Sequence, residues 1–452
     1  MFQRVLVANR GEIAVRVIRA LHELGVEAVA IYSTADSDAL HVALSDQAVC
    51  IGPPAASESY LRIPNVIAAA ETTGCEAIHP GYGFLSENPA FARACAESDL
   101  VFVGPTPEVM ERLGDKAAAK EEMRAASVPL VPGTDGPASL AEVQSAAAEI
   151  GFPVLLKATA GGGGRGMRRV EGPEQLEEAY AAASAEADAA FGDGSLYLEK
   201  VVTPARHVEI QVLCDAEGGV LTLGERECSI QRRHQKLIEE SPSVAITEET
   251  REELEASVAR ACASVGYLGA GTFEFLLGPD GAPYFIEVNC RLQVEHPVTE
   301  LVTGVDLVRE QLRIAAGERL VRSGRAERRG HAIEIRINAE DPARGFAPAP
   351  GLVRRFRPPL GPGVRVDTAI EDGLEIPPYY DSLIAKVIVS DDDRPAAVAR
   401  AIRALGELEV DGIPTTRELA LDVLRSDGFA AGEYSTGYLD EMDRQLPSLR
   451  PA

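Results

Sequence analysis

The sequence lacks the features that define several common protein classes. Its seven cysteines include no Cys-x-x-Cys pair, and no histidine stands at zinc-site spacing from them, which argues against a disulfide framework and against structural zinc. The apolar fraction of 46% is that of an ordinary globular protein and leaves no room for several membrane spans. The first residues lack the basic and apolar regions of a signal peptide. We therefore expect a cytoplasmic protein in a reducing compartment, with no membrane partner.

Positive charge is scarce, and lysine is the scarcer cation. The 44 Lys and Arg face 70 Asp and Glu, so the net charge is −26, which opposes adsorption to nucleic acid. Any polyanionic ligand must then be held by a local basic site. Only six of the 44 basic residues are lysines, and a lysine retained among so many arginines can mark a position that needs a compact ammonium, although gene composition would produce the same skew. The six are Lys116, Lys120, Lys157, Lys200, Lys236 and Lys386.

Two common nucleotide-binding motifs are missing. The first turn, residues 9–12, lacks Gly-x-Gly-x-x-Gly, and no Gly-Lys-Ser/Thr opens a helix, which disfavours a dinucleotide-binding fold and a P-loop kinase. Residues 4–104 instead alternate short Val/Ile-rich runs with amphipathic helical patterns, which predicts a doubly wound parallel sheet. The length of 452 residues corresponds to about three domains.

Two segments are candidates for binding phosphate. Residues 161–164 are four consecutive glycines, whose backbone N–H groups can approach phosphate oxygens, and the upstream Lys157 adds charge. A flexible linker is the alternative interpretation. Residues 231–236 hold four potential cations, and a solvated basic loop is the alternative there. We favour an anion site that contains Lys236 and expect Lys120 to lie outside it.

The segment 271–296 carries the most specific pattern. Asp280-Gly281 predicts a hairpin turn, and a register centred on it places Glu274 across from Glu287 with Cβ atoms about 5 Å apart. Two carboxylates at that distance repel each other unless a cation such as a divalent metal lies between them. Polar and apolar residues then alternate up to Glu295, as in a continuing strand. A half-buried strand with a solvated polar face would show the same alternation.

The polar residues of this segment suit phosphoryl transfer, which needs Mg²⁺, cations over the phosphates and a base. Arg291 near Glu295 suits an oxyacid that must be both held and deprotonated. The metal ligands would be Glu274, Glu287 and Asn289, and the cations would be Lys116, Lys157 and Lys236.

Together these motifs resemble the biotin carboxylases, ATP-grasp enzymes that form the first half of acetyl-CoA and related acyl-CoA carboxylases. The resemblance covers nearly the whole chain and is specific because the motifs occur in order. It rests on residues 8–14, 79–88, the loop from 161, and residues 231–236, 271–275, 289–296 and 336–341.

The resemblance implies an α/β fold with three domains. A Rossmann-like biotin carboxylase domain would span 1–114, an ATP-grasp domain 115–330 with a mobile lid at about 131–202, and a C-terminal α+β domain 331–447. ATP would bind with two Mg²⁺ or Mn²⁺ held by Glu274, Glu287 and Asn289. The ATP contacts would be Lys116, Lys157, Gly163, Gly164, Glu199, Lys200, Val201, Val202, His207, His234, Glu274 and Glu287.

The resemblance also implies a reaction. Glu295 would deprotonate bicarbonate, which attacks the γ-phosphate to give carboxyphosphate, and Arg336 would stabilise the enolate-like oxygen of biotin. The catalytic residues would be Lys236, Arg291, Glu295 and Arg336. Bicarbonate and biotin would contact Tyr82, Lys236, Arg291, Gln293, Val294 and Arg336.

Biotin is expected to arrive on a separate carrier protein. None of the five Met adjoins a Lys, whereas the family's biotinylated Lys lies between two Met, and Lys386 fits a buried or edge strand. The resemblance further implies a carboxyltransferase partner and a homodimer in which Arg16, Arg19 and Glu23 take part. No carrier domain follows within the sequence, so we expect a stand-alone subunit or a truncated one. Cys290 and Pro362 depart from the family pattern, and neither is given a role.

Two other functions stay open at this point. Another ATP-grasp carboxylate ligase would lack the bicarbonate residues, and a regulatory ATP-binding module would lack a base or a metal ligand. The final acyl-CoA is not encoded in this sequence, because that selectivity lies in the carboxyltransferase. Malonyl-CoA for fatty acid synthesis is the expected product, and a propionyl-CoA or pyruvate carboxylase is the alternative.

Overall fold

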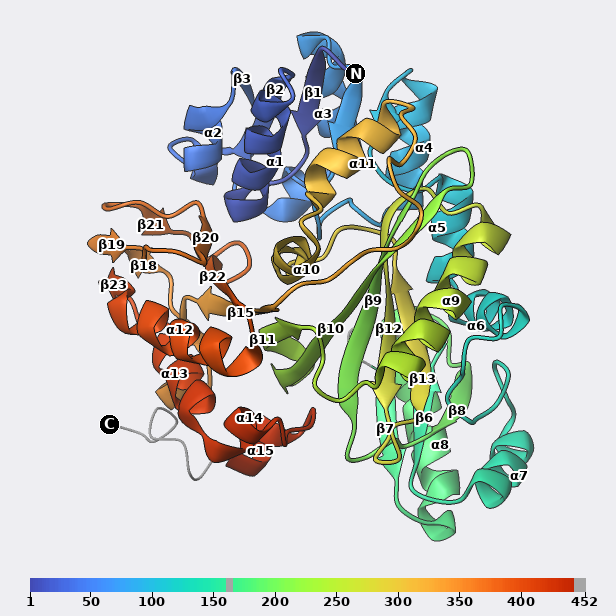
Figure 1. The fold of residues 1–452 in the computed structure, drawn as a ribbon. Coiled ribbons are helices and arrows are strands. Elements are labelled where there is room, and N and C mark those ends of the chain that lie inside the picture. Colours follow the sequence, from blue (N-terminus) through green and yellow to red (C-terminus); the bar gives the residue numbers. More distant parts are fainter. Residues whose placement is uncertain (160–165, 443–452) are drawn as a thin grey trace.

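The computed structural model describes residues 1–159 and 166–442 (Figure 1). Gly163 and Gly164, two of the predicted ATP contacts, lie outside the described residues. Within the described ranges, no helix is both long and apolar enough to cross a membrane. Three sheets of five, three and nine strands position the residues of interest.

The N-terminal sheet has five parallel strands in the order β3-β2-β1-β4-β5. Alternate residues of the central strand face opposite sides: Val5 and Val7 join the cluster of Ile13, whereas Leu6 joins that of Phe91. Helices cover both faces, which confirms the predicted doubly wound parallel sheet. The strands are β1 (Arg4–Val7), β2 (Glu27–Ser33), β3 (Gln47–Gly52), β4 (Ala77–His79) and β5 (Val101–Phe102), and the helices are α1 (Gly11–Glu23), α2 (Leu40–Leu44), α3 (Ile63–Thr73) and α4 (Pro89–Glu97).

A small three-stranded sheet, β7-β6-β8, lies at the lower right of Figure 1 and is reached through α5 (Pro107–Gly114) and α6 (Lys116–Ala125). It has a core of its own, in which Val154 and Leu156 of β6 pack with Val143 of α7 and Leu198 of β8. A separate core suits a unit that moves as a body, so the predicted lid stays a prediction that this arrangement supports. The elements are α7 (Leu140–Ile150), β6 (Val154–Ala158), β7 (Met167–Val170), α8 (Pro173–Phe191) and β8 (Leu196–Lys200).

The nine-stranded sheet runs in the order β13-β12-β9-β10-β11-β15-β22-β20, with β14 paired to β10. Strand β11 pairs with β15 in antiparallel register, Ile238 opposite Ile335, so one sheet crosses the domain boundary predicted at 330. This pairing brings the C-terminal strands beside the predicted site. The strands are β9 (Arg206–Cys214), β10 (Val220–Arg232), β11 (Gln235–Ser241), β12 (Gly269–Leu277), β13 (Pro283–Asn289), β14 (Gly324–Arg325), β15 (His331–Asn338), β20 (Val364–Thr368) and β22 (Leu383–Asp391).

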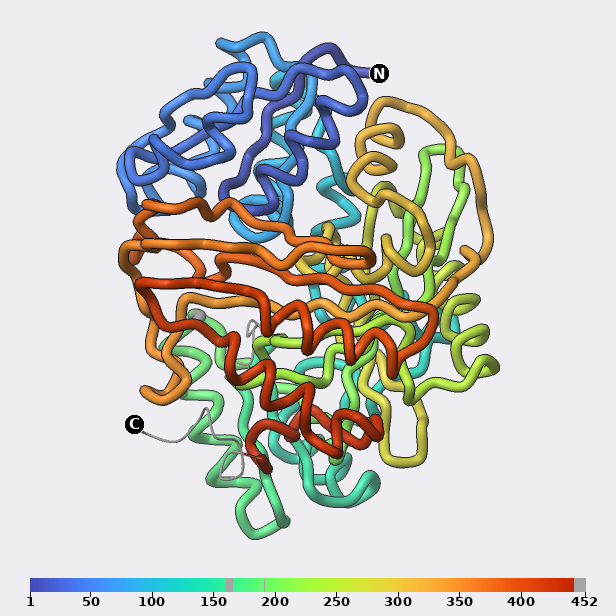
Figure 2. The backbone as a smooth tube through the Cα atoms, turned by 60° about the vertical axis from the view of Figure 1, so that its left-hand side comes forward, coloured from blue at the N-terminus to red at the C-terminus, as the bar shows by residue number. Residues whose placement is uncertain are grey.

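The C-terminal part is α+β, as predicted. Ile335 and Val387 of the sheet pack against Ala401 and Leu405 of α12. Strands β20 and β22 also contact α1 of the N-terminal part, and Figure 2 shows the orange and red C-terminal chain next to the blue N-terminal sheet. The remaining helices are α9 (Glu248–Val265), α10 (His296–Thr303), α11 (Leu307–Ala315), α12 (Arg394–Glu407), α13 (Arg417–Arg425), α14 (Asp427–Ala431) and α15 (Tyr438–Met442), and short strand pairs join β16 (Glu340–Asp341) to β17 (Ala347–Pro348), β18 (Gly351–Leu352) to β21 (Glu375–Ile376) and β19 (Arg355–Arg357) to β23 (Glu409–Asp411).

The hairpin of β12 and β13 confirms one prediction and corrects another. Glu274 pairs with Glu287 as expected, but a bulge shifts the register between Glu274 and Phe275, so the half near the turn pairs one residue differently. The predicted continuation of the strand to residue 295 is wrong. Strand β13 ends at Asn289, and residues 290–295 form an irregular segment that leads into α10. The alternation persists because this loop also buries Cys290 and Leu292.

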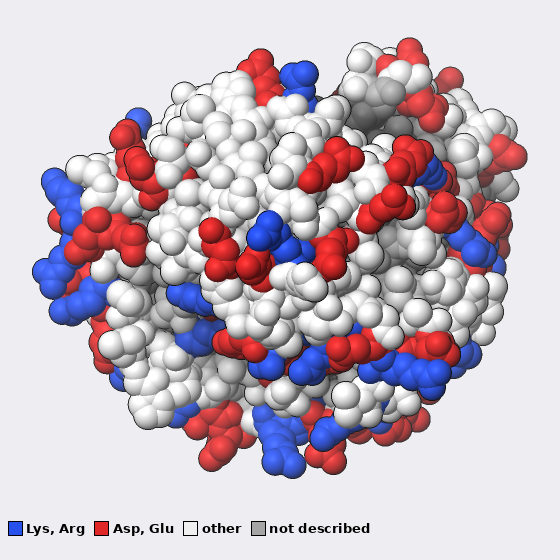
Figure 3. Space-filling view, turned by 90° about the horizontal axis from the view of Figure 1, so that it is seen from above, with Lys and Arg blue, Asp and Glu red and all other residues white. Residues whose placement is uncertain are grey.

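On the face shown in Figure 3, acidic and basic side chains are interspersed rather than gathered by sign. Arg325, for example, contacts the exposed carboxylates of Glu248 and Glu252 at 2.7 and 2.6 Å. Exposed ion pairs of this kind contribute only about 0 to 1 kcal/mol each. The buried charges around Lys236 and Glu295 differ from these pairs because they are shielded from solvent.

Candidate active site

The paired carboxylates of Glu274 and Glu287 differ in environment. Glu274 is buried, and although burial opposes its ionisation, Lys236 and His207 outweigh that effect and hold its pKa far below the usual range. Burial and the like charge of Glu274 raise the pKa of Glu287. The ionised form is therefore stabilised in Glu274 and destabilised in Glu287. A divalent cation between the two carboxylates would stabilise the ionised form of Glu287.

Lys236 lies where three carboxylates converge. Its Nζ is 2.6 Å from Glu209, 3.2 Å from Glu274 and 2.5 Å from Glu295. These acids outweigh the effect of burial and raise the pKa of Lys236 well above its usual value. Within the predicted anion cluster, Lys236 is thus a largely buried cation, whereas Arg233 and His234 at the turn before it are exposed.

Glu295 is held between two cations. Oε1 accepts from Lys236, and Oε2 accepts from Arg336 Nη2 at 2.8 Å. Despite burial, Lys236 and Arg336 hold the pKa of Glu295 well below its usual value. Arg336 also donates to Glu239 at 2.5 Å, and burial raises the pKa of that second acid to about 7. The sheet register places Arg336 here, because β15 lies next to β11.

Arg291 is fixed from the N-terminal part. Its Nε donates to Glu87 Oε2 at 2.7 Å, and the backbone N–H of Cys290 donates to the other oxygen at 2.8 Å. Arg291 also donates to Asn289 Oδ1 at 2.9 Å. Glu87 is not predicted as a partner of Arg291 from the sequence, although it lies inside the motif 79–88. Cys290 itself is buried away from solvent.

Gln293 is oriented by a buried arginine. Arg226 is fully buried and donates to Gln293 Oε1 at 2.9 Å, while Gln293 Nε2 donates to Glu274 at 2.8 Å. Arg226 also contacts Glu209 at 2.5 Å and Gln211 at 2.7 Å. Neither Arg226 nor Glu209 was singled out from the sequence, because on a strand each looks like an ordinary polar position.

A second group of lysines surrounds Glu199 of β8. Lys157 forms an ion pair with this carboxylate, and Lys120 lies 2.7 Å from it and 4.3 Å above the ring of Tyr197. Burial opposes the ionisation of Glu199, but the two lysines outweigh it and lower the pKa. Lys120 does not contact the cluster around Lys236, but its helix places it against Glu199, which is itself a predicted ATP contact. Burial and Lys157 lower the pKa of Lys116 at the start of the same helix.

Several predicted contacts are not gathered with these clusters. Lys200 Nζ donates to the carbonyls of Gly151 and Phe152 at 2.8 and 3.1 Å, so it fastens the lid backbone. Val201 and Val202 are half-buried in the segment after β8. His234 is exposed at the β10–β11 turn, with φ of 65°.

His207 and Tyr82 approach the site from two further sides. His207 Nε2 lies 3.0 Å from Glu274 Oε2. Tyr82 is half-buried, and its hydroxyl donates to Glu12. The Val294 carbonyl accepts from Lys386 Nζ at 2.8 Å.

The donor set fits a hard divalent metal. The described residues include two groups with metal-ligand spacing, His207–Glu209–Glu274 and Glu209–Cys228–Glu295. Lys236 lies among the carboxylates of both groups and already neutralises them. Glu274 and Glu287 are directly paired across β12 and β13, and Asn289 donates to Glu274 at 2.9 Å, so these residues could offer a Mg²⁺ ion the oxygen ligands that it prefers.

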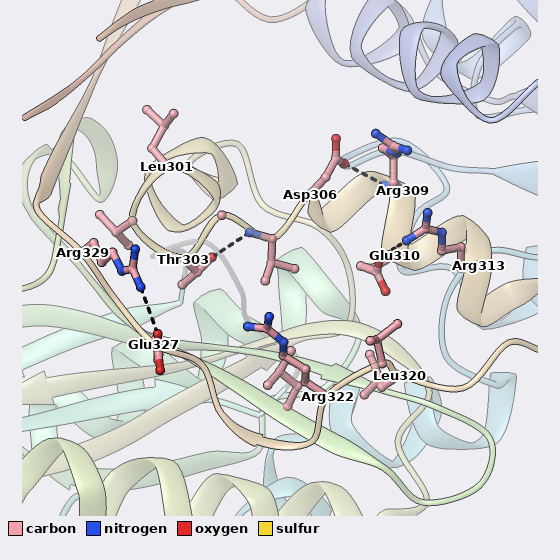
Figure 4. Close-up of a pocket in the computed structure, with 15 residues that line it drawn as sticks. Leu301, Thr303, Asp306, Arg309, Glu310, Arg313, Leu320, Arg322, Glu327 and Arg329 are labelled. Atoms are coloured by element: carbon pink, nitrogen blue, oxygen red, sulfur yellow. Dashed lines mark hydrogen bonds and ion pairs between the residues drawn. The ribbon is translucent and has the colours of Figure 1, made fainter.

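A cavity of about 660 Å³ lies elsewhere, between α11 and the segment around residues 320–329 (Figure 4). None of the predicted site residues lines it. Its arginines pair locally, Arg313 with Glu310 at 2.7 Å and Arg329 with Glu327 at 3.4 Å. This cavity is therefore separate from the predicted site residues, and we give it no role.

Comparison with known families accounts for almost the whole chain. "Biotin carboxylase, N-terminal domain" matches residues 1–110, "Carbamoyl-phosphate synthase L chain, ATP binding domain" matches 115–323, and "Biotin carboxylase C-terminal domain" matches 334–441.

Similar proteins agree over their full length. A biotin carboxylase from Nostoc sp. is 52% identical over 98% of this chain and 100% of its own length. The structure of a biotin carboxylase–β-γ-ATP complex from Campylobacter jejuni has a TM-score of 0.94 and 46% identity over 98% of this chain and 99% of that one. The biotin carboxylase domain dimer of Hydrogenobacter thermophilus 2-oxoglutarate carboxylase, solved with MgADP, ADP and bicarbonate, has a TM-score of 0.92 and 50% identity over 98% of both chains. Together with the site geometry, these matches show that the chain belongs to the biotin carboxylase family.

Proposed function

We propose that this chain uses ATP and bicarbonate to carboxylate biotin carried by another protein, the first half-reaction of an acetyl-CoA or related acyl-CoA carboxylase. The observation that carries the proposal is the ionised Glu295 between Lys236 and Arg336, with Arg291 on the same loop. This arrangement offers one base and several cations to a small oxyacid. Malonyl-CoA for fatty acid synthesis is the product when acetyl-CoA is the final acceptor.

ATP lies between the lid and the nine-stranded sheet in this proposal. Lys157 and Lys120 converge on Glu199 from the lid side, and Lys236 supplies a cation from the sheet side. Glu274, Glu287 and Asn289 would hold two Mg²⁺ or Mn²⁺, which when bound neutralise phosphate charge. The other contacts assigned to the nucleotide are Lys116, Lys200, Val201, Val202, His207 and His234, together with Gly163 and Gly164.

Glu295 is the proposed base. In the free protein both its oxygens bond to cations, so it is ionised but weakly basic. Phosphate and bicarbonate offer Lys236 and Arg336 new anionic partners, and the basicity of Glu295 rises as its own contacts weaken. Glu295 then takes the bicarbonate proton, a bicarbonate oxygen bonds to the γ-phosphorus, and ADP leaves.

The product carboxyphosphate breaks down to CO₂ and phosphate next to biotin. Phosphate takes the ureido proton, and the ureido nitrogen bonds to CO₂. Arg336 stabilises the negative charge that develops on the ureido oxygen. Arg291, Gln293 and Val294 hold the carboxylate, and Tyr82 contacts biotin.

The partners proposed are a biotin carrier, a carboxyltransferase and a second copy of this chain. Arg19 and Glu23 are exposed on α1 and available to a partner subunit. Arg16 instead forms ion pairs inside the chain, 3.0 Å from Glu300 and 2.6 Å from Asp306. We therefore assign the dimer contact to Arg19 and Glu23. A cytoplasmic location is part of the same proposal.

The test is ATP hydrolysis by the purified chain with Mg²⁺, with and without bicarbonate and free biotin. The proposal predicts that bicarbonate is required and that biotin increases the rate. Equal rates in bicarbonate-depleted and bicarbonate-supplemented buffer would contradict it, and stimulation by a different carboxylate would favour another ATP-grasp ligase.

A further inference from the structure

Lys386 is a fully buried lysine on β22, an inner strand between β15 and β20. It confirms the buried alternative of the sequence analysis and excludes the edge. In the register of the sheet it lies directly opposite Arg336 on one side and Asp367 on the other. Side chains at directly paired positions point to the same face, so Lys386 and Arg336 share the face that carries Glu295.

The ammonium of Lys386 contacts three separate parts of the chain. It donates to the Val294 carbonyl at 2.8 Å, and it lies 3.2 Å from Glu12 of α1 and 3.9 Å from Asp367 of β20. Val294 directly precedes Glu295, and Glu12 accepts from the hydroxyl of Tyr82. One cation therefore joins the loop of the proposed base to the residue proposed to contact biotin.

We propose that Lys386 is a positioning residue, which fixes the Val294–Glu295 loop and, through Glu12, Tyr82, so that bicarbonate and biotin are held against each other. The inference deepens the proposed function and rests on it. Lys386 touches neither substrate in this account. It acts through the carbonyl of Val294 and the carboxylate of Glu12.

The charge balance around Lys386 indicates that packing alone does not explain it. Asp367 already accepts two hydrogen bonds from Arg365, at 2.8 and 2.7 Å, so Lys386 is not its main partner. Burial lowers the pKa of Lys386, but Glu12, Glu334 and Asp367 outweigh it and raise the pKa. Well-packed apolar residues often replace a buried ion pair without loss of stability. The buried charge of Lys386 is thus better explained by the groups that it orients, the Val294 carbonyl and the Glu12 carboxylate.

The identity of the cation follows from the same geometry. The acceptors lie on a loop, a helix and a strand around one nitrogen, and an ammonium has three donors that rotate to meet them. A planar guanidinium presents its donors in a fixed fork. This gives a physical reason for one of the six lysines in a chain whose other cations are arginines.

The test compares Lys386→Met with the double variant Lys386→Met/Glu12→Gln. The single change leaves Glu12 without its cation and lowers the melting temperature. The double change removes the unpaired charge, keeps an oxygen that Tyr82 can donate to, and restores the melting temperature. The hydrogen bond to Val294 stays lost in both variants, together with the longer contact to Asp367 and the charge near Glu334. The double variant therefore distinguishes two roles of Lys386. If the lysine only balances charge, the double variant regains activity; if it positions the loop, activity stays low although stability is restored.

Each variant is measured for melting temperature, ATP affinity, kcat and KM for bicarbonate in ADP release, and carboxylation of free biotin. We expect kcat/KM for bicarbonate to fall about 100-fold in both variants, because a displacement of about 1 Å at a reacting group costs that much, while ATP affinity changes less than about twofold. Glu334→Gln is the control, since this neighbouring carboxylate has no hydrogen-bond partner among the described residues. It should keep kcat/KM for bicarbonate.

Two results would overturn the inference. The first is a double variant that regains both stability and kcat/KM for bicarbonate, which would leave Lys386 with charge balance only. The second is a stable Lys386→Met variant with unchanged kinetics. The proposed function is tested separately, on the wild-type protein alone. It is contradicted if wild-type ATP hydrolysis does not depend on bicarbonate, so its failure can be distinguished from a failure of the Lys386 inference.

Discussion

Glu274 and Glu287 occupy directly paired positions on strands β12 and β13, and the carboxylate of Glu274 contacts Lys236 at 3.2 Å and His207 at 3.0 Å. This difference in partners suggests different roles for the two carboxylates. Glu274 is anchored by hydrogen bonds from Lys236, Asn289 and Gln293 at 2.8 to 3.2 Å, whereas the cation that most favours the ionised form of Glu287 is Lys116 of α6. Loss of the Glu287 carboxylate should therefore affect metal binding more than folding.

Glu287→Gln should raise the Mg²⁺ concentration needed for half-maximal ATPase, because one carboxylate ligand is lost. Loss of an outer-shell partner typically weakens metal binding by roughly 10- to 100-fold, and loss of a ligand should weaken it at least as much. A Mg²⁺ titration at fixed ATP measures the change, with Glu253→Gln on the exposed side of α9 as control. A variant with the wild-type Mg²⁺ requirement would show that Glu287 is not a ligand.

Lys236→Gln should slow the reaction by a factor on the order of 10² to 10³, or about 2 to 4 kcal/mol, because a charged donor disappears from a closed anion site. Lys120 is not a valid control, because it lies 2.7 Å from Glu199 and its loss should weaken ATP binding. Arg329→Gln, with a side chain 87% exposed, is the matched control. Similar small losses in the Lys236 and Arg329 variants would make residues 231–236 a solvated loop after all.

Glu87→Gln should release Arg291 and raise KM for bicarbonate. Hydrogen bonds to charged groups contribute about 1.5 to 3 kcal/mol, which corresponds to roughly 10- to 100-fold. Because Glu87 is partly exposed, the melting temperature should change little. Steady-state kinetics at varied bicarbonate provide the measurement, and an unchanged KM would mean that Arg291 is positioned without Glu87.

Glu240 anchors the C-terminal helices and gives a pH-dependent contribution to stability. His331 lies 2.7 Å from it and Arg394 donates to it at 2.7 Å, and these partners outweigh burial and lower its pKa to about 2. A depressed carboxyl pKa adds stability above the unfolded value near 4.5, and this is lost as pH falls toward 2. Glu240→Gln should cost about 3 kcal/mol at pH 7 and progressively less below pH 4. Urea unfolding at pH 7 and pH 3 compares the two proteins, and a cost that does not depend on pH would contradict the assignment.

The sequence predicts elements well where a pattern is local. The N-terminal sheet follows from alternating apolar runs, and the Glu274–Glu287 pair follows from the Asp-Gly turn, even though a bulge lies beside it. Contacts between distant segments leave no such pattern. Glu87 meets Arg291 and Lys386 meets Val294 only because three parts of the chain fold together.

The alternation of polar and apolar residues also led to one wrong prediction, a strand that continues to residue 295. Residues 290–295 alternate between polar and apolar side chains because the loop buries Cys290 and Leu292 while it presents Arg291 to Glu87. A loop fixed at both ends can show the periodicity of a strand. The contact between Lys120 and Glu199 could not be predicted either, because nothing near Lys120 in sequence shows that Glu199 is its partner.

The central claim is that Glu295 and Arg336, although they lie 2.8 Å apart, act on successive steps. Glu295→Gln removes the proposed base and should stop bicarbonate-dependent ADP release. Arg336→Ala removes the cation proposed for the biotin oxyanion and leaves Glu295 a stronger base, so ADP release should largely persist while carboxybiotin is lost.

The decisive measurement is ADP release and ¹⁴C fixed on biotin, taken in parallel on both variants after their folding has been checked. The account predicts that Glu295→Gln loses both signals and that Arg336→Ala loses only the second. Loss of both signals in Arg336→Ala, as complete as in Glu295→Gln, would contradict the division of roles and make the two residues one functional unit.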